Sequence, residues 1–428
     1  MATDVMARRP HGQVSSRESC VAVDRLRRLH RVVGRLATVV GIVFALCLAP
    51  VAVDTADAQE PAAPQSASSA QLRAAIDTLG SLDYAVRTDA ARLVRRTAPA
   101  QAVPALLEAV STHADGYVRF KALVLLTGFN DVRTQDVMRE SLASPNDRLR
   151  TVAYRYFEHN PDQALLPGLL EALAREQGEF VRPALVRALA SHGRDSRVPP
   201  VLVREAGRGE DFFRSAVLEA LGDYRAAYAF DTLVGIAQLD GPLLDDAALA
   251  LGKLGDPRAV ETLAALQRTA PRTAQPFIAA GICLLGVNCE SHEGYLVQAL
   301  KFSDQSIGYQ ELLRGAAAGL GALGVSGRES AVAALFEVGI PSRDPTRAPV
   351  ALALGALALR NTPTMLSVLK TVSNSPQALD LLAEGFDMLE EDLEKERFFA
   401  TIRRLYWAAA EGSSDRQLMQ TLIGKLDF

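Results

Sequence analysis

Two cysteines are the residues best suited to covalent chemistry. Cys283 and Cys289 begin and end the string CLLGVNC. In an oxidising compartment such a pair can form a disulfide, and the turn at Gly286 would bring the two sulfurs together. Two free buried thiols are an alternative, and redox activity is a further one, although the C-x-x-C redox motif has a different spacing. A zinc site would need more ligands. We expect a structural disulfide.

The histidines show no spacing that is typical of a metal or catalytic site. Beyond the first 58 residues the chain has His113, His159, His192 and His292. None of them forms H-E-x-x-H or H-x₃-H, and neither a phosphate-binding loop nor a G-x-S-x-G motif occurs. The sequence therefore predicts no catalytic residue, no bound metal, no cofactor and no enzymatic activity.

Acidic and arginine residues recur together at a fixed interval. Each arginine follows the previous one after 31 or 32 residues, and an acid precedes it by three or four positions. We call this set the charge ladder: Asp83 and Arg87, Asp115 and Arg119, Asp147 and Arg150, Glu179 and Arg182, Asp211 and Arg214. The guanidinium fork can bond carboxylates and helix-end carbonyls, which predicts a structural role. A charged stripe that binds a partner is the alternative, although the acids would make it nearly neutral.

A repeat of this length indicates a solenoid of helix pairs. In the stretch 243–266 small and apolar residues recur at helical spacing, and Gly255 then suits the end of a helix. Asp256 can cap the next helix, and Pro257 fits its first turn. Repeating this unit predicts about ten helix pairs from Ala70 to Leu389 and two more helical segments after them.

The string LGDPRAV at 254–260 resembles the HEAT-like repeats of the phycobilisome-lyase type. The resemblance implies an all-α fold, a right-handed α-α superhelix of the armadillo type. It also implies that the second helix of each pair lines the concave side, and that the ladder residues bond within and between neighbouring repeats. The repeat signature alone carries no lyase chemistry.

The N-terminus has the layout of a targeting segment. A basic region is followed by an uncharged run from Leu36 to Val53 and then by Ala56-Asp57-Ala58. We expect residues 1–58 to be a signal peptide cleaved after Ala58, or else an uncleaved signal anchor. Either form places the protein outside the cytoplasm. We expect a periplasmic or secreted bacterial protein, or one anchored in the inner membrane and facing the periplasm.

The remaining chain divides into two parts. Residues 59–69 form a Pro/Ala/Ser-rich segment, which predicts a disordered linker. Residues 70–428 form the solenoid, and we expect its C-terminal helices to cap the last repeat. An acidic run at 390–394 precedes an apolar helical face. Docking of that helix into a partner's groove is the alternative.

Charge and aromatic residues narrow the class of partner. Removing residues 1–58 takes away eight basic and five acidic residues and leaves 38 basic and 45 acidic ones. This balance argues against nucleic acid, and we expect no membrane contact beyond the N-terminal anchor. Aromatic residues on second helices would supply interface anchors, unless they only fill gaps between helices. The candidate partner-binding residues are Tyr117, Phe120, Tyr154 and Phe212, and we expect the first two to be the more exposed.

The sequence therefore predicts a non-enzymatic exported scaffold. It would bind a protein partner along the concave face of its superhelix, because repeat proteins present extended concave surfaces. The alternative is an accessory or maturation factor, lyase-like, that holds a cofactor-bearing or substrate protein.

Overall fold

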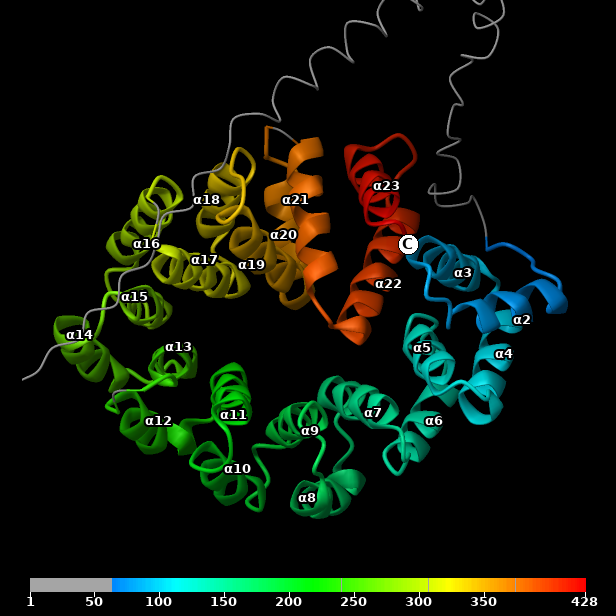
Figure 1. Ribbon diagram of the computed structural model, residues 1–428, viewed down its shortest axis with the longest axis horizontal. Helices are drawn as coiled ribbons and strands as arrows, with labels where there is room; N and C mark the ends of the chain where they lie inside the picture. The colour runs from blue at the N-terminus through cyan, green and yellow to red at the C-terminus, as the bar shows by residue number, and fades with distance from the viewer. Residues whose placement is uncertain (1–63, 240, 307, 374) are drawn as a thin grey trace, which may run out of the picture. The chain divides into compact units, whose positions relative to one another are not determined.

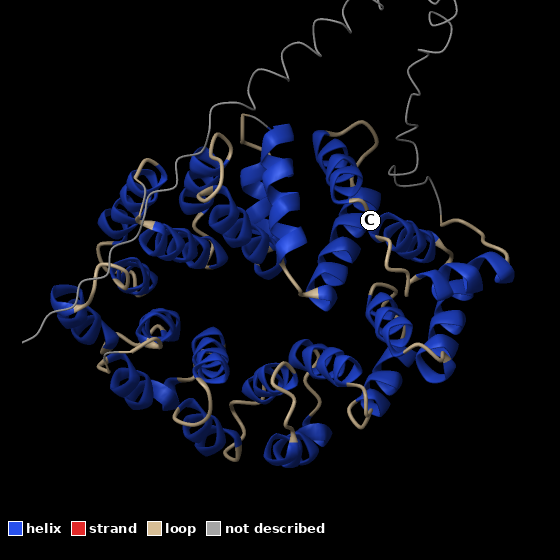
Figure 2. Cartoon of the chain, in the orientation of Figure 1, coloured by secondary structure: helices blue, strands red, loops and turns tan. Residues whose placement is uncertain are grey.

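The computed structural model describes residues 64–428 except 240, 307 and 374. Within these residues, ten helix pairs run from Ser69 to Met388, and two more helices follow (Figures 1 and 2). The predicted all-α superhelix of about ten pairs is confirmed. The predicted signal peptide at 1–58, its cleavage after Ala58 and residues 59–63 of the predicted linker lie outside the described residues.

The first helices of the pairs form one layer of the array. Short 3₁₀ turns at Gln163–Leu165 and Ala227–Ala229 lead into two of them. In chain order they are α2 (Ser69–Thr78), α4 (Pro99–Thr112), α6 (Arg133–Ser141), α8 (Leu166–Arg175), α10 (Val198–Ala206), α12 (Phe230–Ala237), α14 (Ala259–Thr269), α16 (Cys289–Asp304), α18 (Glu329–Gly339) and α20 (Thr362–Leu369).

The second helices pack on one another in sequence and form the inner layer (Figure 1). They are α3 (Tyr84–Arg96), α5 (Gly116–Thr127), α7 (Asp147–His159), α9 (Val181–Ala190), α11 (Asp211–Asp223), α13 (Leu244–Leu254), α15 (Gln275–Leu284), α17 (Gln310–Val325), α19 (Arg347–Arg360) and α21 (Ser375–Met388). The last two helices are α22 (Asp392–Ala408) and α23 (Ser414–Leu426).

Side-chain caps and glycines begin and end these helices. Asp83 accepts a hydrogen bond from the backbone N–H of Val86 at the start of α3, and Asp115 caps α5 in the same way. Such caps satisfy backbone donors that have no partner inside the helix. Gly255 ends α13 with a φ of 74°, a left-handed conformation that glycine adopts without strain.

Glycines also allow two neighbouring inner helices to approach closely. A Cβ atom added to Gly252 of α13 would lie 2.5 Å from the Cα atom of Gly281 in α15. A Cβ atom on Gly281 would lie 2.6 Å from the carbonyl oxygen of Ala248. Both distances are too short for a real contact, so a larger residue at either position would push the two helices apart. The close spacing of these repeats therefore depends on glycine.

The array closes on itself through its C-terminal helices. Helix α22 packs against α19 near the end of the chain and also against α5 and α7 near its start (Figure 1). Leu393 of α22 is 2% exposed and belongs to the same buried cluster as Leu123 and Phe157 of the early repeats. The expectation of helices that only cap the last repeat was therefore incomplete, because α22 joins the two ends of the array.

The end of the predicted linker is ordered. The N–H of Gln65 donates to the carbonyl oxygen of Arg96 at 2.7 Å, and the N–H of Ala98 donates to the carbonyl oxygen of Gln65. Ala67 is buried, and Ser68 caps α2. The prediction of disorder across 59–69 is therefore wrong for residues 64–69, because backbone pairing with the end of α3 fixes this segment.

Candidate interaction surfaces

The four aromatic residues chosen from the sequence have different environments. Phe120 is 7% exposed and Tyr154 is 2% exposed, so the prediction that they bind a partner is wrong. Phe120 lies in the cluster that includes Leu393 of the closing helix, and Tyr154 lies in the core of the central repeats. Tyr117 is partly exposed, and Phe212 is 53% exposed.

Exposed rings gather at the N-terminal ends of the inner helices. Phe180 is 75% exposed where α9 begins, and its ring makes an edge contact with Phe212 of α11, with centroids 6.1 Å apart. Tyr84 is 65% exposed at the start of α3. Tyr117, near the start of α5, has the guanidinium of Arg148 over its ring at 5.3 Å. We call Tyr84, Tyr117, Phe180 and Phe212 the aromatic rim.

The sequence contains a signal for the whole rim, although sequence reasoning named only Tyr117 and Phe212 of its four residues. Tyr84, Phe180 and Phe212 each directly follow a ladder acid, and Tyr117 follows Asp115 after one residue. Inner helices of successive repeats run in the same direction, so their first turns lie along one edge of the array. Position relative to the repeat therefore predicts exposure better than aromatic character does.

The ladder arginines bond to neighbouring backbone and side-chain groups. The Nε of Arg119 donates to the carbonyl oxygen of Val110 at 2.7 Å, and the Nε of Arg214 donates to that of Ala206 at 3.1 Å. Arg150 donates to Ser144 O and also to both carboxylate oxygens of Glu176. Arg87 donates to Ser81 O, and Arg182 donates to Glu205 Oε2. We therefore assign the ladder to holding helix pairs together.

The ladder acids have more varied contacts. Asp83 and Asp115 cap their helices, whereas Asp147 and Asp211 form ion pairs with the arginine of their own repeat. Asn146 takes the capping role at α7. The Glu179 side chain makes no hydrogen bond or ion pair within the described residues. The acids therefore act mainly within their own repeat.

The inner layer also carries a partly buried charge network that sequence reasoning did not anticipate. Arg187 of α9 donates to Glu158 of α7 at 2.8 Å and to Asp223 of α11 at 3.0 Å. Burial by itself would lower the pKa of Arg187, but the nearby carboxylates raise it, so the guanidinium stays charged. The Tyr224 hydroxyl donates to Glu158 at 3.1 Å. Three successive repeats are thus linked through one arginine.

Further arginines extend this network across the array. Arg360 at the end of α19 lies 3.6 Å from Glu219 of α11 and 3.5 Å from Glu391. Arg155 of α7 lies 3.7 Å from the same Glu391. Residues more than 100 positions apart in the chain therefore pair where the array closes.

The first turn of α22 contributes a close ionic contact to the closure. His159 Nε2 lies 2.7 Å from Glu394 Oε1, and Arg397 Nη1 lies 2.8 Å from Glu394 Oε2. Burial raises the pKa of Glu394, but these hydrogen bonds and charges outweigh it and lower the pKa to about 2. Nearby, Lys121 of α5 pairs with Asp392, and Arg95 of α3 pairs with Glu396 at 2.8 Å. The acidic run thus bonds to basic residues of the early repeats.

One repeat carries an acid where the ladder would place arginine. Asp245 occupies this slot at the start of α13, beside Asp246. Burial, together with the negative charges of Asp246 and Glu311, raises the pKa of Asp245 to about 6. The ladder therefore changes its charge at the sixth repeat.

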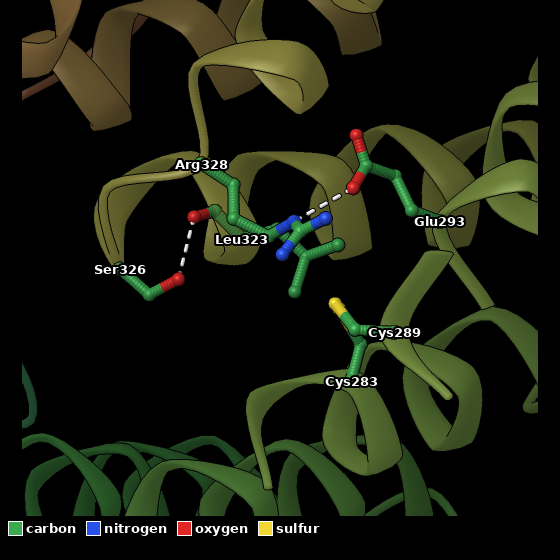
Figure 3. Close-up of a disulfide and its surroundings, with 6 residues drawn as sticks. All are labelled: Cys283, Cys289, Glu293, Leu323, Ser326 and Arg328. Carbon is green, nitrogen blue, oxygen red and sulfur yellow. Dashed lines mark hydrogen bonds and ion pairs between the residues drawn. A yellow bond between two sulfur atoms is a disulfide. The ribbon is translucent and has the colours of Figure 1, made fainter. Parts of the chain in front are cut away.

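A disulfide joins the end of α15 to the start of α16. Cys283 is buried and bonds to Cys289, six positions later, across the turn at Gly286 (Figure 3). One turn further along α16, Glu293 accepts a hydrogen bond from the Nε of Arg328 at 2.7 Å. The disulfide and this ion pair together fix the position of α16.

Removing the disulfide is expected to lower the free energy of unfolding by about 2 kcal/mol, the loop-entropy value for a closed loop of this length. The measurement is urea unfolding of the protein with and without reductant. Cys283→Ala/Cys289→Ala is the matched control, because reductant should not change its stability. Alkylation of both thiols in the unfolded protein without reductant would contradict the disulfide.

No single described helix is long and apolar enough to cross a membrane, whereas the bent pair α19 and α20 meets the length and composition test together. The described residues contain no group of three or more His, Cys, Asp or Glu side chains placed to hold a metal ion.

Comparison with known proteins gives one family and a set of structural neighbours. Residues 72–158 match the family model of HEAT repeats. YibA of Escherichia coli is similar at 16% identity and a TM-score of 0.38, over 51% of this chain and 82% of that one. The complex of CpcE and CpcF of phycocyanin lyase from Nostoc sp. PCC7120 is similar at 19% identity and a TM-score of 0.38. The match covers 60% of this chain and 95% of that one. No curated protein sequence matches the chain.

The family match covers the first three helix pairs, which carry the first three members of the charge ladder. The same pairing of helices continues to Met388. Residues 72–158 of this chain therefore match HEAT repeats, and the helix pairs that follow them continue the same all-α arrangement.

Proposed function

We propose that this protein is a non-enzymatic scaffold, exported from the cytoplasm, that binds a protein partner along the aromatic rim. The observation that supports this proposal most directly is the contact between the exposed rings of Phe180 and Phe212. Exposed rings are costly in water, and aromatic anchors contribute much of the energy of protein interfaces. Two such rings in contact form an apolar patch on adjacent repeats, which a partner can cover without rearranging the array.

The rim replaces the concave face as the proposed surface. Helix α22 contacts α5 and α7, and charged pairs bridge the inner layer from α11 to α19. A partner that entered there would have to displace α22 or separate these charged pairs, and separating them would cost their mutual attraction. Binding at the rim needs no such change.

The disulfide supports export. Disulfides form and persist in oxidising compartments, such as the bacterial periplasm, and are rare in the cytosol. The bond between Cys283 and Cys289 therefore fits the periplasmic address that the N-terminal segment predicts.

Affinity capture in the native host tests this function. The protein would carry a C-terminal tag, the envelope would be crosslinked, and captured proteins would be identified by mass spectrometry. We expect one dominant partner whose recovery falls at least about tenfold in Phe180→Ser/Phe212→Ser, since each lost anchor costs on the order of 1–2 kcal/mol.

Val132→Ser is the matched control, because Val132 is 87% exposed at the start of α6, away from the rim. Recovery should be unchanged in this variant. Equal recovery with the double rim variant would exclude the rim as the binding surface. Absence of any enriched protein, with the bait folded and exported, would argue against a scaffold.

A further inference from the structure

A small polar pocket lies where the array closes. It has a volume of about 310 Å³, which lies at the lower end of the range for small-molecule sites. Its lining comes from segments far apart in the chain: Thr134 of α6, Tyr156 of α7, Thr362 of α20, and Arg397 and Arg404 of α22. A molecule bound there would touch the first and last parts of the array together.

One of the residues that line the pocket has a buried hydroxyl without a partner. Thr134 is 2% exposed, and its Oγ1 makes no hydrogen bond within the described residues. A buried polar group without a partner costs free energy, and such groups are uncommon in folded proteins. Tyr156, whose pKa is raised by burial, also lines the pocket.

The charges around the pocket leave one cation uncompensated. Asp131 is bonded by two nitrogens of Arg133, at 2.8 and 2.9 Å, which hold its pKa at about 2. Arg397 pairs with Glu394. Arg404 bonds only to Ala400 O and Thr401 Oγ1 of its own helix, and no carboxylate within the described residues neutralises it.

We propose that this pocket binds a small ligand through a carboxylate or phosphate group. Arg404 supplies the charge, and the fork of its guanidinium matches the geometry of such oxyanions. The Thr134 hydroxyl gains the hydrogen-bond acceptor that it lacks. Because the pocket walls come from α6, α7, α20 and α22, the bound anion also holds the closing helix against the early repeats.

Calorimetric titration of the purified chain with inorganic phosphate, and separately with succinate, tests this proposal. Sodium chloride at matched ionic strength gives the background of non-specific charge screening. We expect saturable binding of at least one of the two anions. Its affinity should fall at least about tenfold in Arg404→Gln and in Thr134→Val, because each variant removes one donor to the anion.

Arg272→Gln is the matched control, since Arg272 is an exposed arginine before α15 with no role in the pocket. The affinity of the Arg272→Gln variant for the anion should equal that of the unchanged protein. Because Arg404 is exposed, Arg404→Gln should fold normally, which circular dichroism would verify. Absence of saturable binding of both anions, or full affinity in either pocket variant, would overturn the proposal.

Discussion

Leu393→Ala is expected to lower the free energy of unfolding by about 2–5 kcal/mol and to open the closed array. Leu393 is 2% exposed and packs in the cluster of the early repeats, although it belongs to a helix near the C-terminus. Its removal leaves a cavity at the contact that joins the two ends. Urea unfolding measures the stability, and small-angle X-ray scattering measures the radius of gyration, which should rise.

Leu335→Ala separates opening from simple loss of stability. Leu335 of α18 is fully buried, but it packs in the cluster of the later repeats, away from the early ones. This variant should lose stability without a rise in the radius of gyration. If both variants left the radius unchanged, Leu393 would be an ordinary core residue and closure would depend on other contacts.

Glu394→Gln is expected to destabilise the protein by about 3 kcal/mol at neutral pH. The pKa of Glu394 is lowered from 4.5 to about 2 in the folded chain, and each unit is worth 1.36 kcal/mol. A lowered pKa means that the folded state favours the charged form. This stabilisation is fully present above about pH 4.5 and is lost as the pH falls toward 2.

The measurement is the difference in stability between Glu394→Gln and the unchanged protein at pH 7 and at pH 3. The difference should be largest at pH 7 and clearly smaller at pH 3, where the unchanged protein has lost much of the same interaction. Glu411→Gln is the control, because Glu411 is exposed and forms no ion pair within the described residues. A loss of equal size at both pH values would mean that packing, and not the charge, accounts for the effect.

The local signals in the sequence were sufficient for the repeat architecture. Each helix pair contacts mainly its neighbours, so the periodic acid, arginine and glycine residues determine it without information from distant parts of the chain. Gly255 ends its helix and Asp115 caps the next one as such signals require. The number of pairs and their limits followed directly from this periodicity.

The candidate surfaces depended on contacts that no local pattern contains. Phe120 and Phe212 both lie near the start of an inner helix, yet one is buried and the other is exposed. The difference comes from tertiary packing, which buries Phe120 in the cluster that Leu393 of the closing helix shares.

The acidic run at 390–394 likewise has the composition of a solvated helix start. Only the folded chain shows that its carboxylates meet His159 and Arg155 from more than 200 positions earlier. The sequence by itself thus determined the repeats, whose interactions lie within one or two periods. The tertiary structure decided the closure and the surfaces left open, because the curvature accumulated over ten repeats determines which distant residues meet.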